Sequence, residues 1–322
     1  MAIGISLDSS FPHSQHLQTD QGCVYISRLP AELEREIFEI AASISPESIL
    51  SFVLLARRFR IWFEPELYRI IRSGEDGRVV PPPLYDDEKE IRHRSPARNV
   101  LQRFKRAAPI RDSKVLRLER LRQFGPWVNH ILLQNRTAHE IKQVLEACPN
   151  VSNLALWIIH GSCTPLISTL ENLPQLNRLS FDPTSFFVNF TPDFSVEFDQ
   201  PMFRNLTHLE IINVSSSWTK WRQLALLPKL THLALANVAD QTFIDRILNE
   251  CALLEVFVMF YMDLYTLGDL VSLVQKDPRV VLLLSVVDHL AHWEDGARGG
   301  TDFWVTAERK VALAKIMKVE GL

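Results

Sequence analysis

From residue 128 onward, apolar residues recur in a fixed order along the chain. Six segments share an apolar-x-x-apolar-x-apolar pattern: Val128/Ile131/Leu133, Val151/Leu154/Leu156, Leu176/Leu179/Phe181, Leu206/Leu209/Ile211, Leu230/Leu233/Leu235 and Leu254/Phe257/Met259. Their central positions are separated by 23, 25, 30, 24 and 24 residues, and a weaker seventh copy lies near residues 280–287. The last two apolar residues of each copy are two positions apart, a spacing that predicts a short strand with one buried face.

Helical segments precede most of these predicted strands. They cover residues 138–147, 165–173, 218–227 and 243–249. One strand and one helix cannot bury an apolar face alone, whereas stacked copies can. The spacing is close to the leucine-rich-repeat period of ~20–29 residues. We therefore predict an α/β fold in which residues 100–302 form a leucine-rich-repeat-like solenoid, with parallel strands on one face and helices on the other. Residues 303–322 are predicted to form a C-terminal capping helix.

The 30-residue spacing comes from an insertion rich in phenylalanine between the third and fourth strands. Its aromatic residues are Phe186, Phe187, Phe190, Phe194 and Phe198. We expect a surface loop that packs either on the solenoid or on a partner.

Residues 26–72 follow a different pattern, which predicts three short helices. Pro30 and the acidic residues after it suit a helix start, and apolar residues then recur at helical spacing up to Ile44. Ser45 is a candidate N-cap for a second helix, and Glu64-Pro65 begins a third that carries Ile70 and Ile71. Three helices in so few residues form a small core, so such a module gains stability from a partner or a neighbouring domain.

Composition limits the classes of function. The 322 residues carry a net charge of −3, which provides no overall field to attract nucleic acid. No apolar run is long enough for a membrane helix, and no signal peptide is evident, so we expect a cytoplasmic or nuclear protein without nucleic-acid or membrane partners. Residues 1–25 are predicted to be a disordered tail and residues 73–99 a linker.

No motif for a bound cofactor or a catalytic nucleophile occurs in the sequence, and we expect neither an enzyme nor a cofactor. Residues between the apolar anchors point to the other face of the predicted sheet. That face presents the target-binding candidates His130, Asn153, Trp157, Arg178, His208, Glu210 and His232. His208, Glu210 and His232 are compatible with a metal or catalytic site, but ligands on flat adjacent strands rarely complete a tetrahedral shell. We interpret the polar strip as a concave surface that binds a target protein.

The N-terminal segment resembles an F-box. The resemblance rests on Leu29-Pro-Ala-Glu-Leu33, Ile37-Phe38-Glu39, Pro46-Glu-Ser-Ile-Leu50, Ala56-Arg-Arg-Phe-Arg60, Trp62 and Glu64-Pro-Glu-Leu-Tyr-Arg69. It is most similar to the expanded F-box-like family of mushroom-forming fungi, in which a leucine-rich-repeat-like region follows a short linker; the stretch Met202-Phe-Arg-Asn-Leu-Thr-His-Leu-Glu210 is typical of that region.

This resemblance implies a substrate receptor of a Skp–cullin–F-box ubiquitin ligase. The F-box would bind a Skp-type adaptor, and through it a cullin, while the repeats would bind a target protein that the sequence does not identify. The Skp-facing positions implied by the family are Leu29, Pro30, Leu33, Ile37, Ile49, Leu50, Val53 and Leu54.

Two other hypotheses remain open. Repeat arrays need caps, so the F-box-like helices could serve only to cap the start of an interaction scaffold that has no role in ubiquitin ligation. A third hypothesis is a hydrolase that uses His208, Glu210 and His232.

Overall fold

The computed structural model describes residues 29–45, 48–73, 79–80, 119, 121–187, 196–212, 221–236, 241–261, 276–285 and 288–320. The predicted tail 1–25, residues 100–118 and most of the predicted linker lie outside the described residues. The chain divides into two compact units, residues 1–48 and residues 49–322, so the boundary falls inside the segment that resembles an F-box. Each unit is described by itself.

The first unit contains one described helix, α1 (Ala31–Ile44). It begins directly after Pro30, and Glu32 and Glu34 occupy its first turn, where carboxylates interact favourably with the helix dipole. Exposed apolar side chains follow the helix at intervals of three and four residues: Leu29, Leu33, Ile37, Ile40 and Ile44. These intervals place the last four on one face of α1, and Leu29 lies two residues before the helix.

The second unit begins with α2 (Ile49–Leu55) and α3 (Arg57–Tyr68), which pack together through the rings of Phe52 and Phe63, 5.6 Å apart. The next residues form strand β1 (Ile70–Ser73). The prediction that Ile70 and Ile71 belong to the third helix is therefore wrong. Both side chains are buried, and a pair of β-branched residues packs well on the pleated surface of a sheet.

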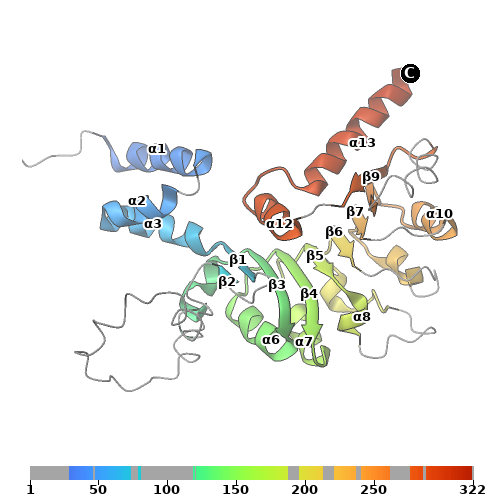
Figure 1. The fold of residues 1–322 in the computed structure, drawn as a ribbon, viewed down its shortest axis with the longest axis horizontal. Helices are drawn as coiled ribbons and strands as arrows, with labels where there is room; N and C mark the ends of the chain where they lie inside the picture. Colours follow the sequence, from blue (N-terminus) through green and yellow to red (C-terminus); the bar gives the residue numbers. More distant parts are fainter. Residues whose placement is uncertain are drawn as a thin grey trace, which may run out of the picture. The chain divides into compact units, whose positions relative to one another are not determined.

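The described strands form one nine-stranded sheet in the order β2-β1-β3-β4-β5-β6-β7-β8-β9. The bounds of the other strands are β2 (Val79–Val80), β3 (His130–Thr137), β4 (Asn153–His160), β5 (Arg178–Phe181), β6 (His208–Ile211), β7 (His232–Leu235), β8 (Val256–Tyr261) and β9 (Val280–Leu284). All neighbouring pairs are parallel except β1 and β2, and β2 lies within the predicted linker. The predicted α/β class with parallel strands is confirmed (Figure 1).

The register of the strands aligns the central position of each repeat. Ile131, Leu154, Leu179, Leu209, Leu233 and Phe257 are cross-strand partners in that order. All six are buried in the main core. The period of the apolar pattern therefore predicted the strand register correctly.

Helices and turns of 3₁₀ type connect the strands on one side of the sheet. They are η4 (Gly125–Trp127), α6 (Ala138–Ala147), α7 (Thr164–Glu171), α8 (Pro183–Phe186), η5 (Pro201–Phe203), η6 (Arg222–Leu226) and α10 (Gln241–Glu250). Helix α6 matches its predicted range. Thr137 is its N-cap and forms a capping box with Glu140. The helix predicted over 218–227 is instead a 3₁₀ turn over its described part, η6.

The described part of the phenylalanine insertion is core. Phe186, Phe187 and Phe198 are buried. The rings of Phe186 and Phe187 meet Phe181 edge to face, and the ring of Phe198 contacts Phe203 at 5.0 Å. These three residues therefore belong to the main core and not to a surface loop; Phe190 and Phe194 lie outside the described residues.

The C-terminal helices cover the other face of the sheet. These helices are α12 (His289–Ala297) and α13 (Phe303–Glu320), and Figure 1 shows them on the side opposite α6 and α7. Trp304, Ala307 and Val311 of α13 form a second buried cluster with strand residues such as Val258 and Phe260. The first half of α13 thus lies over the face of the sheet opposite the main core, whereas Leu313, Ile316 and Met317 farther along the helix are exposed. None of the described helices has the length and apolar character needed to span a membrane.

Candidate functional site

The predicted polar strip runs across the sheet on the face opposite the main core. His130, Asn153, Arg178, His208 and His232 are successive cross-strand partners from β3 to β7. Glu210 is paired with Ser180 one column further along, and Trp157 lies farther along β4. The structure therefore brings together all seven target-binding candidates on one face.

Helix α13 covers the part of this strip formed by β5 to β7. The indole ring of Trp304 stands edge-on to the rings of both His208 and His232, at 5.2 and 5.7 Å. Arg178 Nη1 lies 3.7 Å from Asp302 Oδ2, at the start of the same helix. We expected an open concave surface, and the structure differs here, because His232 is only 8% exposed.

Three residues of this site were missed by the sequence analysis: Asp302, Trp304 and Glu308. Asp302 Oδ1 accepts from the backbone N–H of Val305, and an aspartate at a helix start is a readable signal. That signal predicts where a helix begins, but carries no information about the surface on which the helix packs.

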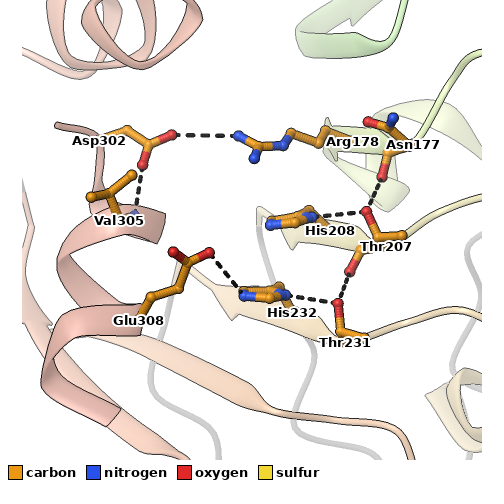
Figure 2. A network of polar contacts seen from close by, with 9 residues as sticks. All are labelled: Asn177, Arg178, Thr207, His208, Thr231, His232, Asp302, Val305 and Glu308. Carbon is orange, nitrogen blue, oxygen red and sulfur yellow. Dashed lines mark hydrogen bonds and ion pairs between the residues drawn. The ribbon is translucent and has the colours of Figure 1, made fainter. Parts of the chain in front are cut away.

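The two central histidines form a stacked pair. Their ring centroids are 4.0 Å apart and their planes differ by 11°. Figure 2 shows that the Nδ1 atom of each ring contacts the side chain of the threonine that precedes it. Thr207 Oγ1 lies 2.9 Å from His208 Nδ1, and Thr231 Oγ1 lies 2.8 Å from His232 Nδ1. The Nε2 atoms point away from the threonines, toward α13 (Figure 2).

Burial keeps the histidines of this face neutral. It lowers the pKa of His208 from 6.5 to about 2, with His232 and Arg178 adding to the effect. The pKa of His232 is lowered as well, chiefly by burial, although the nearby carboxylates of Glu308 and Glu255 oppose the shift. His130 also has a lowered pKa of about 4, through burial and the positive charges of Arg69 and Arg178.

Glu210 ends a short chain of polar contacts. Trp157 Nε1 donates to Ser180 Oγ at 2.8 Å, and a hydrogen bond from Ser180 favours the carboxylate of Glu210. Burial outweighs that bond and, with the charge of Asp302, raises the pKa of Glu210 to about 7. The hydrolase hypothesis joined Glu210 to the histidine pair, but the carboxylate that lies 3.2 Å from His232 Nε2 belongs to Glu308.

A small cavity of about 40 Å³ lies at the covered part of the strip, lined by residues that include Trp157, Arg178, Glu210, His292 and Trp304. The cavity therefore has room for water molecules or an ion. One group of potential metal ligands also occurs among the described residues: single ligand atoms of His208, His232 and Glu308 lie within 4.8 Å of one another.

The predicted Skp-facing residues are mostly exposed. Leu29, Pro30, Leu33, Ile37, Leu50 and Leu54 are exposed, Val53 is half-buried and Ile49 is buried. No protein-family model and no curated protein matches the chain.

Proposed function

We propose that this chain is a substrate-receptor adaptor of a Skp–cullin–F-box ubiquitin ligase and acts by binding, not by catalysis. Residues 29–55 would bind a Skp-type adaptor, and the sheet would hold the target protein. The observation that carries the proposal is that α1 and α2, each taken by itself, expose apolar side chains at the positions that the F-box resemblance assigns to the Skp interface.

The exposure of these apolar side chains is large. Ile37 of α1 is 52% exposed, and Leu54 of α2 is 85% exposed. A soluble chain that leaves a row of apolar side chains in water on one helix face usually uses them to bind a partner. A partner surface would bury them, as expected for docking on an adaptor subunit.

The repeated strands support the second half of the proposal. Each strand from β3 to β8 belongs to one copy of the apolar pattern, and the copies stack in parallel register. We interpret them as degenerate leucine-rich repeats. Asn153 and Trp157 on β4 are half-buried, and together with His130 they form the part of the strip on β3 and β4 that we assign to target binding.

The test is binding of the purified full chain to a purified fungal Skp-type adaptor. We expect a complex with the wild type, and loss of the complex in Leu29→Asp/Leu50→Asp, because two carboxylates cannot be buried in an apolar interface without partners. A matched control is Leu226→Asp/Leu253→Asp, which places the same charges at exposed apolar positions of the second unit.

The control variant should bind as the wild type does, and both variants should keep the melting temperature of the wild type. A wild-type chain that fails to bind the adaptor contradicts the proposal. Equal binding by Leu29→Asp/Leu50→Asp would contradict the assignment of the interface.

A second function is favoured by one observation: α3 is continuous with the sheet. Tyr68 at its end stacks on Phe124 with ring centroids 3.9 Å apart, and β1 pairs directly with β3. These contacts are what an N-terminal cap of a repeat scaffold requires. In this hypothesis, α2 and α3 stabilise the repeats and no ubiquitin ligase is involved.

A further inference from the structure

We propose that His208, His232 and Glu308 form a binding site for a divalent transition-metal ion of the zinc class, which fastens α13 to strands β6 and β7. The three side chains come from two distant parts of the chain. The histidines are cross-strand partners in the sheet, and Glu308 lies one turn beyond Trp304 on α13.

The hydrogen-bond network assigns the tautomer of each histidine. Thr207 Oγ1 donates to the backbone carbonyl of Asn177 at 3.1 Å, and Thr231 Oγ1 donates to the carbonyl of Thr207 at 3.2 Å. A hydroxyl has one proton to give, so each Oγ1 must accept from the neighbouring ring. The proton of each neutral imidazole therefore lies on Nδ1, and each Nε2 carries a lone pair; His232 Nε2 lies 3.2 Å from Glu308 Oε1.

Both lone pairs face α13, where Glu308 lies (Figure 2). A metal-binding histidine typically donates its other ring N–H to an oxygen that fixes the ring, and Thr207 and Thr231 provide those oxygens. His208 Nε2 is buried and has no hydrogen-bond partner among the described residues, as expected for an atom whose partner is an ion.

The spacing of the ligand atoms suits a small ion. Bonds of about 2.1 Å in a tetrahedral shell place two ligand atoms about 3.4 Å apart. Glu308 Oε1 and His232 Nε2 are already 3.2 Å apart, and all three ligand atoms lie within 4.8 Å of one another. A small tilt of one ring and a rotation of the Glu308 side chain would complete the set.

The ligand types and charges select the ion. Two neutral imidazoles and one carboxylate suit zinc and similar ions, whereas magnesium and calcium prefer oxygen ligands. Arg178 also faces the histidines, but Asp302 lies beside its guanidinium and offsets its charge. Glu308 is 47% exposed, which gives an ion a route from solvent and leaves a fourth position for water.

The experiment uses the full chain freed of metal by chelation. Binding of Zn²⁺ is measured by calorimetry, and bound Co²⁺ by its visible absorption, with Mg²⁺ as the ion that should not bind. We expect one Zn²⁺ per chain, a Co²⁺ spectrum of tetrahedral type, and slower proteolysis within α13 when Zn²⁺ is present.

Glu308→Gln should weaken Zn²⁺ binding by at least about tenfold, and so should Thr231→Val, which removes the oxygen that fixes His232. Glu308 is half-exposed, so its variant tests the site even if a histidine variant does not fold. His139→Gln, at an exposed position of α6, should bind as the wild type does. The proposal is overturned if Zn²⁺ does not bind, if Glu308→Gln binds as the wild type does, or if His139→Gln abolishes binding.

Discussion

At the scale of single residues, the polar strip combines buried histidines with cations that face them. His130 is the example outside the stacked pair. Its Nδ1 is buried without a hydrogen-bond partner among the described residues, and Arg69 and Arg178 both repel its charged form. The folded protein therefore holds His130 neutral under conditions in which the unfolded chain protonates it.

This arrangement predicts a loss of stability in acid. The pKa of His130 is about 4 in the folded state against 6.5 ordinarily, so its contribution is complete above pH 6.5 and declines as the pH falls toward 4. When the pH falls from 7.5 to 5.5, the free energy of unfolding should decrease by about 1 kcal/mol less in His130→Gln than in the wild type. Urea denaturation at the two pH values measures this difference. The free energy of unfolding of His139→Gln should decrease as much as that of the wild type. An equal decrease in His130→Gln would show that His130 is not buried in its neutral form.

Single residues also explain which parts of the site were predictable. His208 and His232 were found because they occupy the same position in successive repeats, and the strand period fixes the face to which they point. Cys148 and Cys251 likewise share a position in their repeats, and burial raises the pKa of their thiols to about 12 and about 11, consistent with packing positions. Glu308 lies outside the repeated pattern, so no period in the sequence could place it beside His232.

At the scale of elements, the strands and α6 followed from local pattern. The strand columns become apolar at Ala236 and Phe260, which suggested that residues 303–317 cover that end, and α13 does pack on Phe260. Residues 303–320 include clear helix-forming residues, but helix propensity alone does not show which face of the helix packs on the sheet. The partner surface here is apolar only at β7 to β9, where Ala234, Val258 and Val281 pack against Trp304 and its neighbours. That contact joins residues far apart in the sequence, and the pairing of Glu308 with His232 left no local signal.

One strained feature belongs to a pair of neighbouring strands. Asn135 on β3 and Ile158 on β4 both adopt positive φ angles, 57° and 55°. They lie at matching positions, because the residues on either side of them are cross-strand partners. Asparagine tolerates this conformation, but for a β-branched residue it is a genuine outlier.

We therefore expect Ile158→Gly to raise the free energy of unfolding by about 1 kcal/mol, because glycine adopts positive φ without a steric penalty. The Ile158 side chain is 51% exposed, so its removal sacrifices little packing. Chemical denaturation measures the change. Ile158→Val keeps the branched Cβ and should show no gain; a gain of the same size in that variant would rule out relief of backbone strain.

At the scale of the whole molecule, the division after Ser48 falls inside residues 26–72, which the sequence pattern predicted to be one module. Helix α1 belongs to the first unit, whereas α2, α3 and β1 belong to the unit that contains the sheet. An F-box pattern describes the order of apolar anchors along the chain, but it does not reveal which helices pack on a neighbouring domain. The adaptor proposal requires α1, and the cap hypothesis requires only residues 49–73.

Two deletions use this division to separate the proposals. Removal of residues 2–48 should leave the melting temperature of the sheet unchanged and abolish binding to a Skp-type adaptor. Removal of residues 2–72 also deletes buried Phe63, Tyr68 and Ile71. Each such side chain contributes about 1.5–3 kcal/mol, so the melting temperature should fall by more than about 5 °C. Calorimetry and adaptor binding, measured on both deletions and the full chain, give distinct results for each hypothesis.

If the helices only cap the repeats, the full chain does not bind the adaptor, and only the longer deletion has an effect. If the chain is an adaptor, the shorter deletion loses binding while the sheet keeps its stability. Adaptor binding that survives removal of residues 2–48 would contradict a role for α1, and would place the interface on α2 and α3 alone. A sheet that melts at a lower temperature after the shorter deletion would contradict the independence of the second unit.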